Sequence, residues 1–233
     1  MPGTTVEKKK DRLASPSSIS NQLGGVTVIN HPLIQVHLTK LRDKTTQPSL
    51  FRASVKRLAT LMVYEATKDL KVLDTVVETP LTETSGVALS QRVGLVPILR
   101  AGLGMIDPVL DLLPMAEVWH LGLYRDEETA QPIRYYDKLP PQNPVDVAII
   151  LDPMLATGGS AMAALMTLRE WGVKQAKVVS LIASQEGVDA VASQFPEAQI
   201  YVAQVDPTLN DRKFIVPGLG DAGDRIFNTV DHS

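Results

Sequence analysis

A carboxylate and a glycine-rich loop follow one strongly apolar segment, and together they could bind a sugar phosphate. Residues 145–151 are apolar apart from Asp146, which is typical of a parallel strand buried on both faces. Asp152 follows at the carboxyl end of this strand, and the sequence Thr-Gly-Gly-Ser at 157–160 begins five residues later. Glycines let successive N–H groups approach an anion, and a helix expected over 161–171 adds the positive end of its dipole. The segment predicts a ligand with both hydroxyl groups and a phosphate.

Two arginines follow other expected strands. Arg100 comes directly after the strand expected over 93–99, and it is followed by Gly102 and Gly104. A guanidinium at that point can bind a diphosphate through its planar fork of donors. Arg125 lies in a hairpin extension expected near residues 123–140, where one guanidinium could stabilise the charge of a departing anion.

A glycine-rich segment lies near the C-terminus, at residues 214–225. Its glycines expose backbone N–H and C=O groups, which can match the edge of a small planar heterocycle. Asp221 within it could hold a cation or a group linked to ribose.

The first segment alone is also compatible with an ordinary connection between a strand and a helix, Arg100 with a surface arginine that caps a loop, and the C-terminal segment with a plain turn. The first lacks the Gly-Lys-Ser/Thr ending of a Walker loop and the spacing of a dinucleotide-binding fingerprint. The argument for a site depends on several anion-binding loops occurring together.

Strands that alternate with helices must position these loops. Better strand predictions lie at 93–99, 118–123, 145–151, 177–183 and 200–205, with weaker ones at 26–29, 72–79 and 87–89. Helices are expected over 37–42, 49–67, 104–113, 161–171 and 187–195. This alternation predicts an α/β fold, a mainly parallel sheet flanked by helices. We expect an N-terminal arm at 1–25 and a single domain at 26–233 that includes the hairpin extension.

Four segments together resemble those of the uracil phosphoribosyltransferases, a branch of the type I phosphoribosyltransferases. They are PILRAGLGM at 97–105, YRDEET at 124–129, DPMLATGGS at 152–160 and IVPGLGDAGDR at 215–225. The resemblance covers roughly residues 28–228. It implies the type I phosphoribosyltransferase fold and transfer of phosphoribose from 5-phosphoribosyl-1-diphosphate (PRPP) to N1 of uracil, giving UMP and diphosphate with Mg²⁺ present.

The resemblance also implies roles for single residues. It makes Asp221 and Arg125 the catalytic residues. It assigns PRPP to Arg100, Arg125, Asp152, Pro153, Met154, Leu155, Ala156, Thr157, Gly158, Gly159, Ser160 and Asp221. It assigns uracil to Ile215, Gly220, Asp221 and Ala222. It implies no metal ligands from the protein, since Mg²⁺ arrives bound to PRPP. It further implies a homo-oligomer, a dimer or a tetramer, and GTP or CTP as effectors.

Composition excludes several kinds of chemistry. The chain has 233 residues and no cysteine, which excludes disulfides, thiolate catalysis and cysteine-based zinc sites. No apolar run reaches membrane-spanning length, and no secretory signal is expected, so we expect a cytoplasmic protein. The net charge of −3 disfavours non-specific binding to nucleic acid.

Two alternatives remain open. One is an RNA-binding regulator of pyrimidine genes built on the same fold, which would require a basic face. The other is a phosphoribosyltransferase for a different base. The segment at 215–225 discriminates between bases, and it resembles the uracil type.

Overall fold

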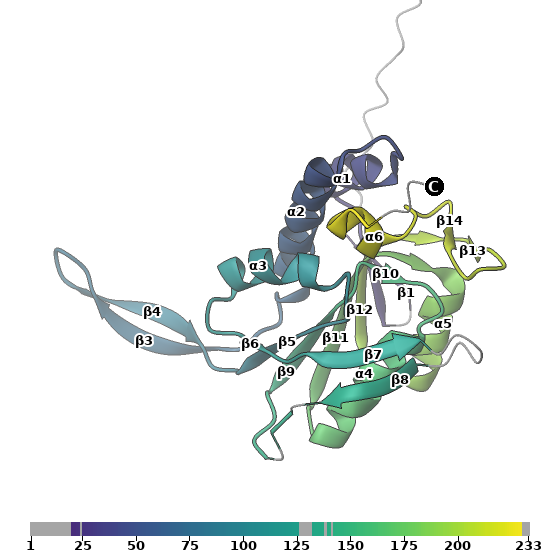
Figure 1. Ribbon diagram of the computed structural model, residues 1–233. Coiled ribbons are helices and arrows are strands. Elements are labelled where there is room, and N and C mark those ends of the chain that lie inside the picture. The colour runs from purple at the N-terminus through teal and green to yellow at the C-terminus, as the bar shows by residue number, and fades with distance from the viewer. Residues whose placement is uncertain (1–19, 24, 126–131, 138, 141, 230–233) are drawn as a thin grey trace, which may run out of the picture.

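A mostly parallel sheet lies at the centre of the molecule (Figure 1). The computed structural model describes residues 20–23, 25–125, 132–137, 139–140 and 142–229, and only the backbone of 20–23, 122–125 and 132–137. In this part of the chain the main sheet has eight strands. Seven of them lie in the order β1 (Ser20–Leu23), β2 (Val26–Ile29), β12 (Gln199–Asp206), β11 (Gln175–Ser184), β9 (Val147–Leu151), β5 (Val93–Pro97) and β6 (Glu117–Val118). The eighth, β10 (Met154–Leu155), pairs with β11. Only β1 pairs in the antiparallel sense.

Helices cover both faces of this sheet. One face packs against α1 (Pro32–Arg42), α2 (Pro48–Ala66), α3 (Leu103–Leu112) and α6 (Ala222–Phe227), and the other against α4 (Gly159–Trp171) and α5 (Gln185–Gln194). Strand β9 shows why both faces are covered, because its side chains alternate between two separate apolar clusters. The α/β fold with a mainly parallel sheet is confirmed. None of the helices in the described part of the chain combines the length and the apolar character needed to cross a bilayer.

Helix α2 forms much of the core on its side of the sheet. Phe51, Val55, Leu58 and Met62 recur at helical spacing, and each is at most 1% exposed. Pro48 occupies the first turn, where its missing N–H leaves no helical hydrogen bond unmade. The helix therefore lies within one residue of the predicted 49–67.

Two hairpins stand outside the main sheet. The expected extension forms from β7 (Leu121–Arg125) and β8 (Pro132–Asp137), which pair in the antiparallel sense, and residues 126–131 between them lie outside the described residues. The other hairpin, β3 (Val72–Glu78) and β4 (Glu83–Leu89), projects from the body as an arm (Figure 1). Strands were expected at 72–79 and 87–89, but the arm was not.

The remaining differences from the sequence prediction concern the ends of elements. Residues 20–23, within the predicted arm 1–25, form β1 on the edge of the sheet. Residues 1–19 and 24 of that arm lie outside the described residues, as do 230–233. The expected strand 118–123 is divided between β6 and β7, and α1 begins at Pro32, five residues before the predicted start. The C-terminal segment adds the short pair β13 (Thr208–Leu209) and β14 (Ile215–Val216).

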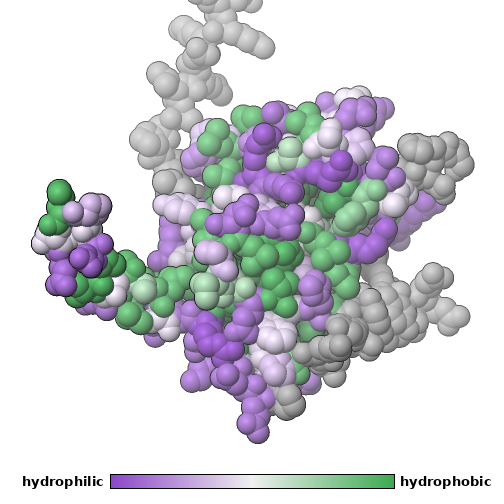
Figure 2. Space-filling view, turned by 60° about the vertical axis from the view of Figure 1, so that its left-hand side comes forward, coloured by the Kyte–Doolittle hydropathy of each residue, from purple (hydrophilic) through white to green (hydrophobic). Residues whose placement is uncertain are grey.

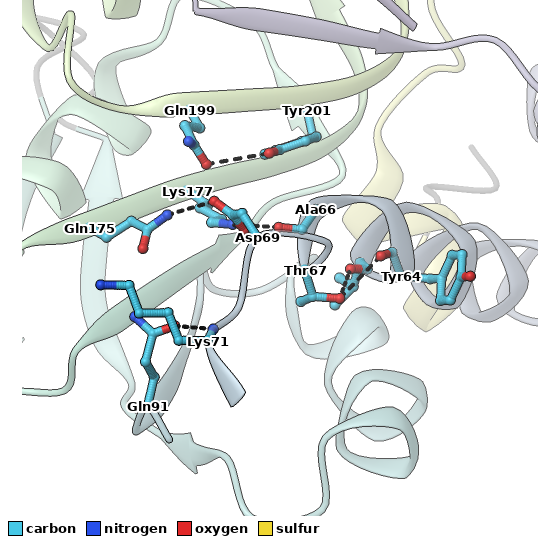
Figure 3. A network of polar contacts seen from close by, with 11 residues as sticks. Tyr64, Ala66, Thr67, Asp69, Lys71, Gln91, Gln175, Lys177, Gln199 and Tyr201 are labelled. Carbon is cyan, nitrogen blue, oxygen red and sulfur yellow. Dashed lines mark hydrogen bonds and ion pairs between the residues drawn. The ribbon is translucent and has the colours of Figure 1, made fainter. Parts of the chain in front are cut away.

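A buried lysine connects α2 to the sheet at the edge opposite the carboxyl ends of the strands (Figure 3). Lys177 of β11 is fully buried, forms an ion pair with Asp69, and donates to the carbonyl of Ala66 over 2.5 Å. Gln175 donates to the other oxygen of Asp69 over 2.8 Å. Burial by itself would raise the pKa of Asp69, but the hydrogen bonds and the charge of Lys177 outweigh it and lower that pKa.

Replacement of this lysine tests its contribution to stability. We expect Lys177→Met to lower the free energy of unfolding at pH 7 by about 2 kcal/mol, at the low end for a broken buried pair because Asp69 is half-exposed and water can solvate it. The depressed pKa of Asp69 means that the stabilisation is complete above the unfolded-state pKa and is lost as pH falls through the folded-state pKa. Urea unfolding at neutral and acidic pH should therefore show the difference shrinking in acid.

Lys68→Met is the matched control, because Lys68 pairs with Glu65 at the surface. Its effect should stay below about 0.5 kcal/mol. Equal losses in the two variants, or a loss in Lys177→Met that does not change with pH, would contradict the assigned role of the buried pair.

Candidate active site

The ends of β5 and β9 bring the Arg100 loop against Asp152. The N–H of Ile98 donates to the carbonyl of Leu151 over 3.0 Å, which extends the pairing of the two strands by one residue. A Cβ atom at Gly102 would lie 2.3 Å from the same carbonyl oxygen, so only glycine fits this close approach. The peptide bond between Leu99 and Arg100 is cis. Arg100 and Asp152 thus leave adjacent strands at one edge of the sheet, as the sequence predicted.

Arg100 also reaches the C-terminal segment. Its guanidinium lies 3.0 Å from a carboxylate oxygen of Asp224 in α6, and its side chain is 60% exposed. A hydrogen bond from Thr229, followed by the hydrogen bond and charge of Arg100, lowers the pKa of Asp224. This exposed ion pair brings together two of the sequence-predicted segments, the Arg100 loop and the loop before α6.

Asp152 occupies a position with unusual electrostatics. Burial raises the pKa of its carboxyl group to about 7, against a weaker opposing effect from the N–H of Met154, which donates to it over 3.3 Å. Desolvation disfavours the charged form when no cation lies close by. The carboxyl group therefore changes charge near neutral pH.

The loop after Asp152 divides into two parts. Pro153 and Leu155 are buried, β10 pairs with β11, and the carbonyl of Pro153 accepts from the N–H groups of Leu181 and Ile182. These two residues therefore hold the loop against β11, and their contact with PRPP stays a prediction. Gly158 has a φ of 81°, and α4 begins directly after it with no side-chain cap. The N–H of Gly159 donates to the hydroxyl oxygen of Thr157 over 3.5 Å. The N–H groups of Ser160 and Ala161, which follow in the first turn, have no helical partner and can donate to an anion.

Ser184 supports this loop and was not singled out from the sequence. It is fully buried at the end of β11, and its hydroxyl donates to the carbonyl of Ala156 over 2.5 Å. The hydroxyl oxygen of Ser184 also accepts from the N–H of Gly187 and so caps α5. A serine between a strand and a helix is a recognisable cap signal, but only the fold shows that it also holds the loop.

The glycine-rich segment 215–222 forms a second loop at the same edge. Ile215 and Ala222 are buried, whereas Gly220 and Asp221 are exposed. Asp221 caps α6, because one of its carboxylate oxygens accepts from the N–H of Asp224 over 2.9 Å. Of the residues assigned to uracil, the loop thus exposes Gly220 and Asp221 and buries Ile215 and Ala222, and their contact with uracil stays a prediction.

Arg125 is the one predicted site residue whose side chain lies outside the described residues. Its backbone ends β7, where it pairs with Pro132. Its contact with PRPP and its catalytic role stay predictions.

The described residues include no group of three or more His, Cys, Asp or Glu side chains that could hold a metal ion. Asp152 lies between β9 and β10, whereas Asp221 caps α6, and the neighbouring Asp224 is paired with Arg100. Such a donor set suits an Mg²⁺ that keeps most of its ligands from substrate phosphates.

A parallel α/β sheet with an acidic residue and an anion-binding loop at its carboxyl edge places the chain among the type I phosphoribosyltransferases. The structure is similar in fold to adenine phosphoribosyl transferase from Trypanosoma brucei, with a TM-score of 0.52 at 10% identity over 85% of this chain and 89% of that one. It is closer to the AQ2163 protein from Aquifex aeolicus, with a TM-score of 0.82 at 37% identity over 87% and 97% of the two chains.

Sequence comparison gives the family within this class. The sequence profile of uracil phosphoribosyltransferase matches residues 28–229. A uracil phosphoribosyltransferase from Roseiflexus sp. (strain RS-1) is 55% identical over 204 residues, which cover 88% of this chain and 98% of that protein. One from Bacillus cereus (strain B4264) is 50% identical over 208 residues, or 89% and 100%. The chain belongs to the uracil phosphoribosyltransferase family, and it is an enzyme.

The ionisation of Asp152 predicts how PRPP binding depends on pH. If the carboxylate accepts hydrogen bonds from ribose hydroxyls, affinity for PRPP should rise as pH increases from 6 to 8 through the pKa of about 7. Calorimetric titration of PRPP into the wild type and Asp152→Asn checks this. The variant lacks this ionising group, so its profile reports the remaining ionisations, including that of PRPP. Identical profiles for the two proteins would contradict the assignment.

Proposed function

We propose that the chain makes UMP by joining uracil to PRPP: the Arg100 loop and residues 152–160 would bind PRPP, and residues 215–222 would bind uracil. The observation that carries this proposal is the Arg100–Asp224 ion pair, because it puts the loop predicted to bind diphosphate in contact with the helix after the loop predicted to bind uracil. A transfer between two substrates needs this adjacency.

The first substrate site would bind PRPP. Residues 156–160 would bind the 5′-phosphate through N–H groups of the first turn of α4 and the hydroxyls of Thr157 and Ser160. Asp152 would accept hydrogen bonds from the ribose hydroxyls. Arg100 would exchange its exposed partner Asp224 for the diphosphate. Arg125 is assigned to the same diphosphate by resemblance.

The reaction would exchange one bond at C1′ for another. The bond from N1 of uracil to C1′ forms, the bond from C1′ to the diphosphate oxygen breaks, and diphosphate leaves with the electron pair. Arg100 and Arg125 would stabilise the leaving charge, and backbone groups of Ile215, Gly220 and Ala222 would orient uracil. Asp221, whose cap uses only one carboxylate oxygen, would take the N1 proton.

Magnesium would enter with PRPP. Bound to its oxygens, the ion would neutralise part of the diphosphate charge. By resemblance, Asp221 would approach PRPP or this ion, and the protein would supply no direct metal ligand.

The direct test is product formation with several bases. Purified protein is incubated with PRPP, Mg²⁺ and uracil, orotate, adenine or hypoxanthine, and UMP and diphosphate are measured. We expect turnover with uracil alone, and a loss of at least about tenfold in kcat/KM for Asp152→Ala. Addition of GTP or CTP tests the nucleotide effect that the family resemblance implies. No turnover with any base, by folded protein, would favour the regulator, and RNA binding would then be measured.

We further propose that the β3–β4 arm binds a second copy of the chain. Large apolar side chains of the arm are exposed, among them Val76 at 67% and Leu81, in the turn at its tip, at 94%. Figure 2 shows hydrophobic residues along the face of the arm that is in view. An isolated two-stranded hairpin is marginally stable in water, so such an arm needs a partner. A pocket of about 550 Å³ lies at its base, lined by Leu89, Leu112 and Met115 among others. In a two-fold symmetric dimer each arm would pack against the base of the other, which would cover the exposed apolar side chains of both.

Changes on the arm test this interface. Leu81→Asp combined with Val76→Asp should convert a dimer to a monomer at micromolar concentration, because each charge would have to be buried against apolar groups. Light scattering coupled to size-exclusion chromatography measures the mass. Thr82→Asp, on the polar part of the same tip, is the control and should remain a dimer. A monomeric wild type, or a double variant of unchanged mass, would contradict this interface.

A further inference from the structure

Asp206 is a buried carboxylate that neither the sequence argument nor the proposed reaction uses. It ends β12, and its side chain is 4% exposed. Arg42, the last residue of α1, donates to both of its oxygens, over 2.8 and 2.7 Å. A two-pronged pair of this kind fixes orientation as well as distance.

The same ion pair holds the two peptide groups that flank one glycine. The N–H of Gly218 donates to Asp206 over 3.0 Å, and the carbonyl of Gly218 accepts from Arg42 over 2.8 Å. Gly218 has a φ of 58°, and a Cβ atom there would lie 2.0 Å from the carbonyl oxygen of Ile215. Glycine has no side chain to limit its backbone conformation, and here Asp206 and Arg42 hold it in one conformation through these two hydrogen bonds.

A second arginine ties the far end of the loop to the same helix terminus. Arg225 donates to the carbonyls of Leu219 and Asp43, over 2.7 and 2.6 Å, and to that of Leu41. Its guanidinium lies 4.3 Å from the ring centre of Phe51. The loop from Gly218 to Asp221 is thus held against the C-terminal end of α1 on both sides.

We infer that Arg42 and Asp206 are positioning residues for base recognition, which set the orientation of the loop that would read uracil. The inference rests on the proposed function, in which Gly220 and Ala222 contact uracil through their backbone. A site that reads a base with peptide groups discriminates only if those groups keep their directions before the base arrives. The pair supplies that restraint without touching the substrate.

The test compares how substitutions change KM for uracil and KM for PRPP. Asp206→Asn removes the charge and leaves Arg42 in place, and we expect KM for uracil to rise about tenfold while KM for PRPP changes by less than about twofold. Arg42→Lys keeps a charge but cannot bond to Asp206 and Gly218 in the same way, so it should show a smaller split in the same direction. Arg42→Lys therefore tests the positioning role even if Asp206→Asn does not fold.

Glu197→Gln is the matched control. It breaks an exposed ion pair with Arg169 at the other end of β12, and both Michaelis constants should stay at wild-type values. Unchanged constants in Asp206→Asn, or equal changes in both constants, would overturn the positioning role.

Hydrogen exchange separates this inference from the proposed function. The amides of 218–221 should exchange faster in Asp206→Asn than in the wild type, whereas those of 156–160 should not change. This readout requires no turnover, so a wild type inactive with uracil would refute the function and leave exchange to decide whether the pair holds the loop. Unchanged exchange at 218–221 would overturn the inference.

Discussion

The parallel pairing of β5, β9, β11 and β12 is the constraint on which the rest of the structure depends. Register places Leu151 beside both Pro97 and Val179, and Ser184 beside Asp206. Parallel strands end at one edge, so the loops that follow them must emerge together. Residues far apart in the sequence become neighbours there because the strands before them are paired. The sheet therefore assembles the site, and the helices on both faces keep its strands buried.

Sheet pairing brings the loops together but does not hold their backbone directions. Each loop is supported from behind by a buried polar group from the end of the adjoining strand. Ser184 of β11 binds the carbonyl of Ala156, and Asp206 of β12 binds the N–H of Gly218. Backbone groups that recognise a ligand must be oriented before it binds, because ordering them afterwards costs conformational entropy. The two supports thus perform the same task for the two loops.

The loops could be predicted from short stretches of sequence. The residues that support them could not, because those residues lie far from the loops or from each other along the chain. The segment from Val145 to Ser160 contains a buried strand, a carboxylate, glycines and a helix start within 16 residues, so its chemistry could be predicted without the fold. Arg42 and Asp206 are 164 residues apart, and no spacing rule links them. One signal was available, since Asp206 follows an expected strand directly, as Asp152 does. The projection of the β3–β4 arm was missed because strand propensity does not show whether a pair joins the main sheet.

Burial explains why two arginines at the same edge have different roles. Arg42 is 24% exposed and its partner Asp206 is 4% exposed, whereas Arg100 and Asp224 are 60% and 36% exposed. An exposed pair contributes at most about 1 kcal/mol, so a diphosphate can replace Asp224 at little cost. Separating a buried pair leaves a desolvated charge and costs about 3 kcal/mol or more, so Asp206 is not released when a ligand arrives. Under the proposed function, Arg100 would therefore be an exchangeable contact and Arg42 of α1 a permanent support for residues 218–221, and the burial of the partner carboxylate sets this difference.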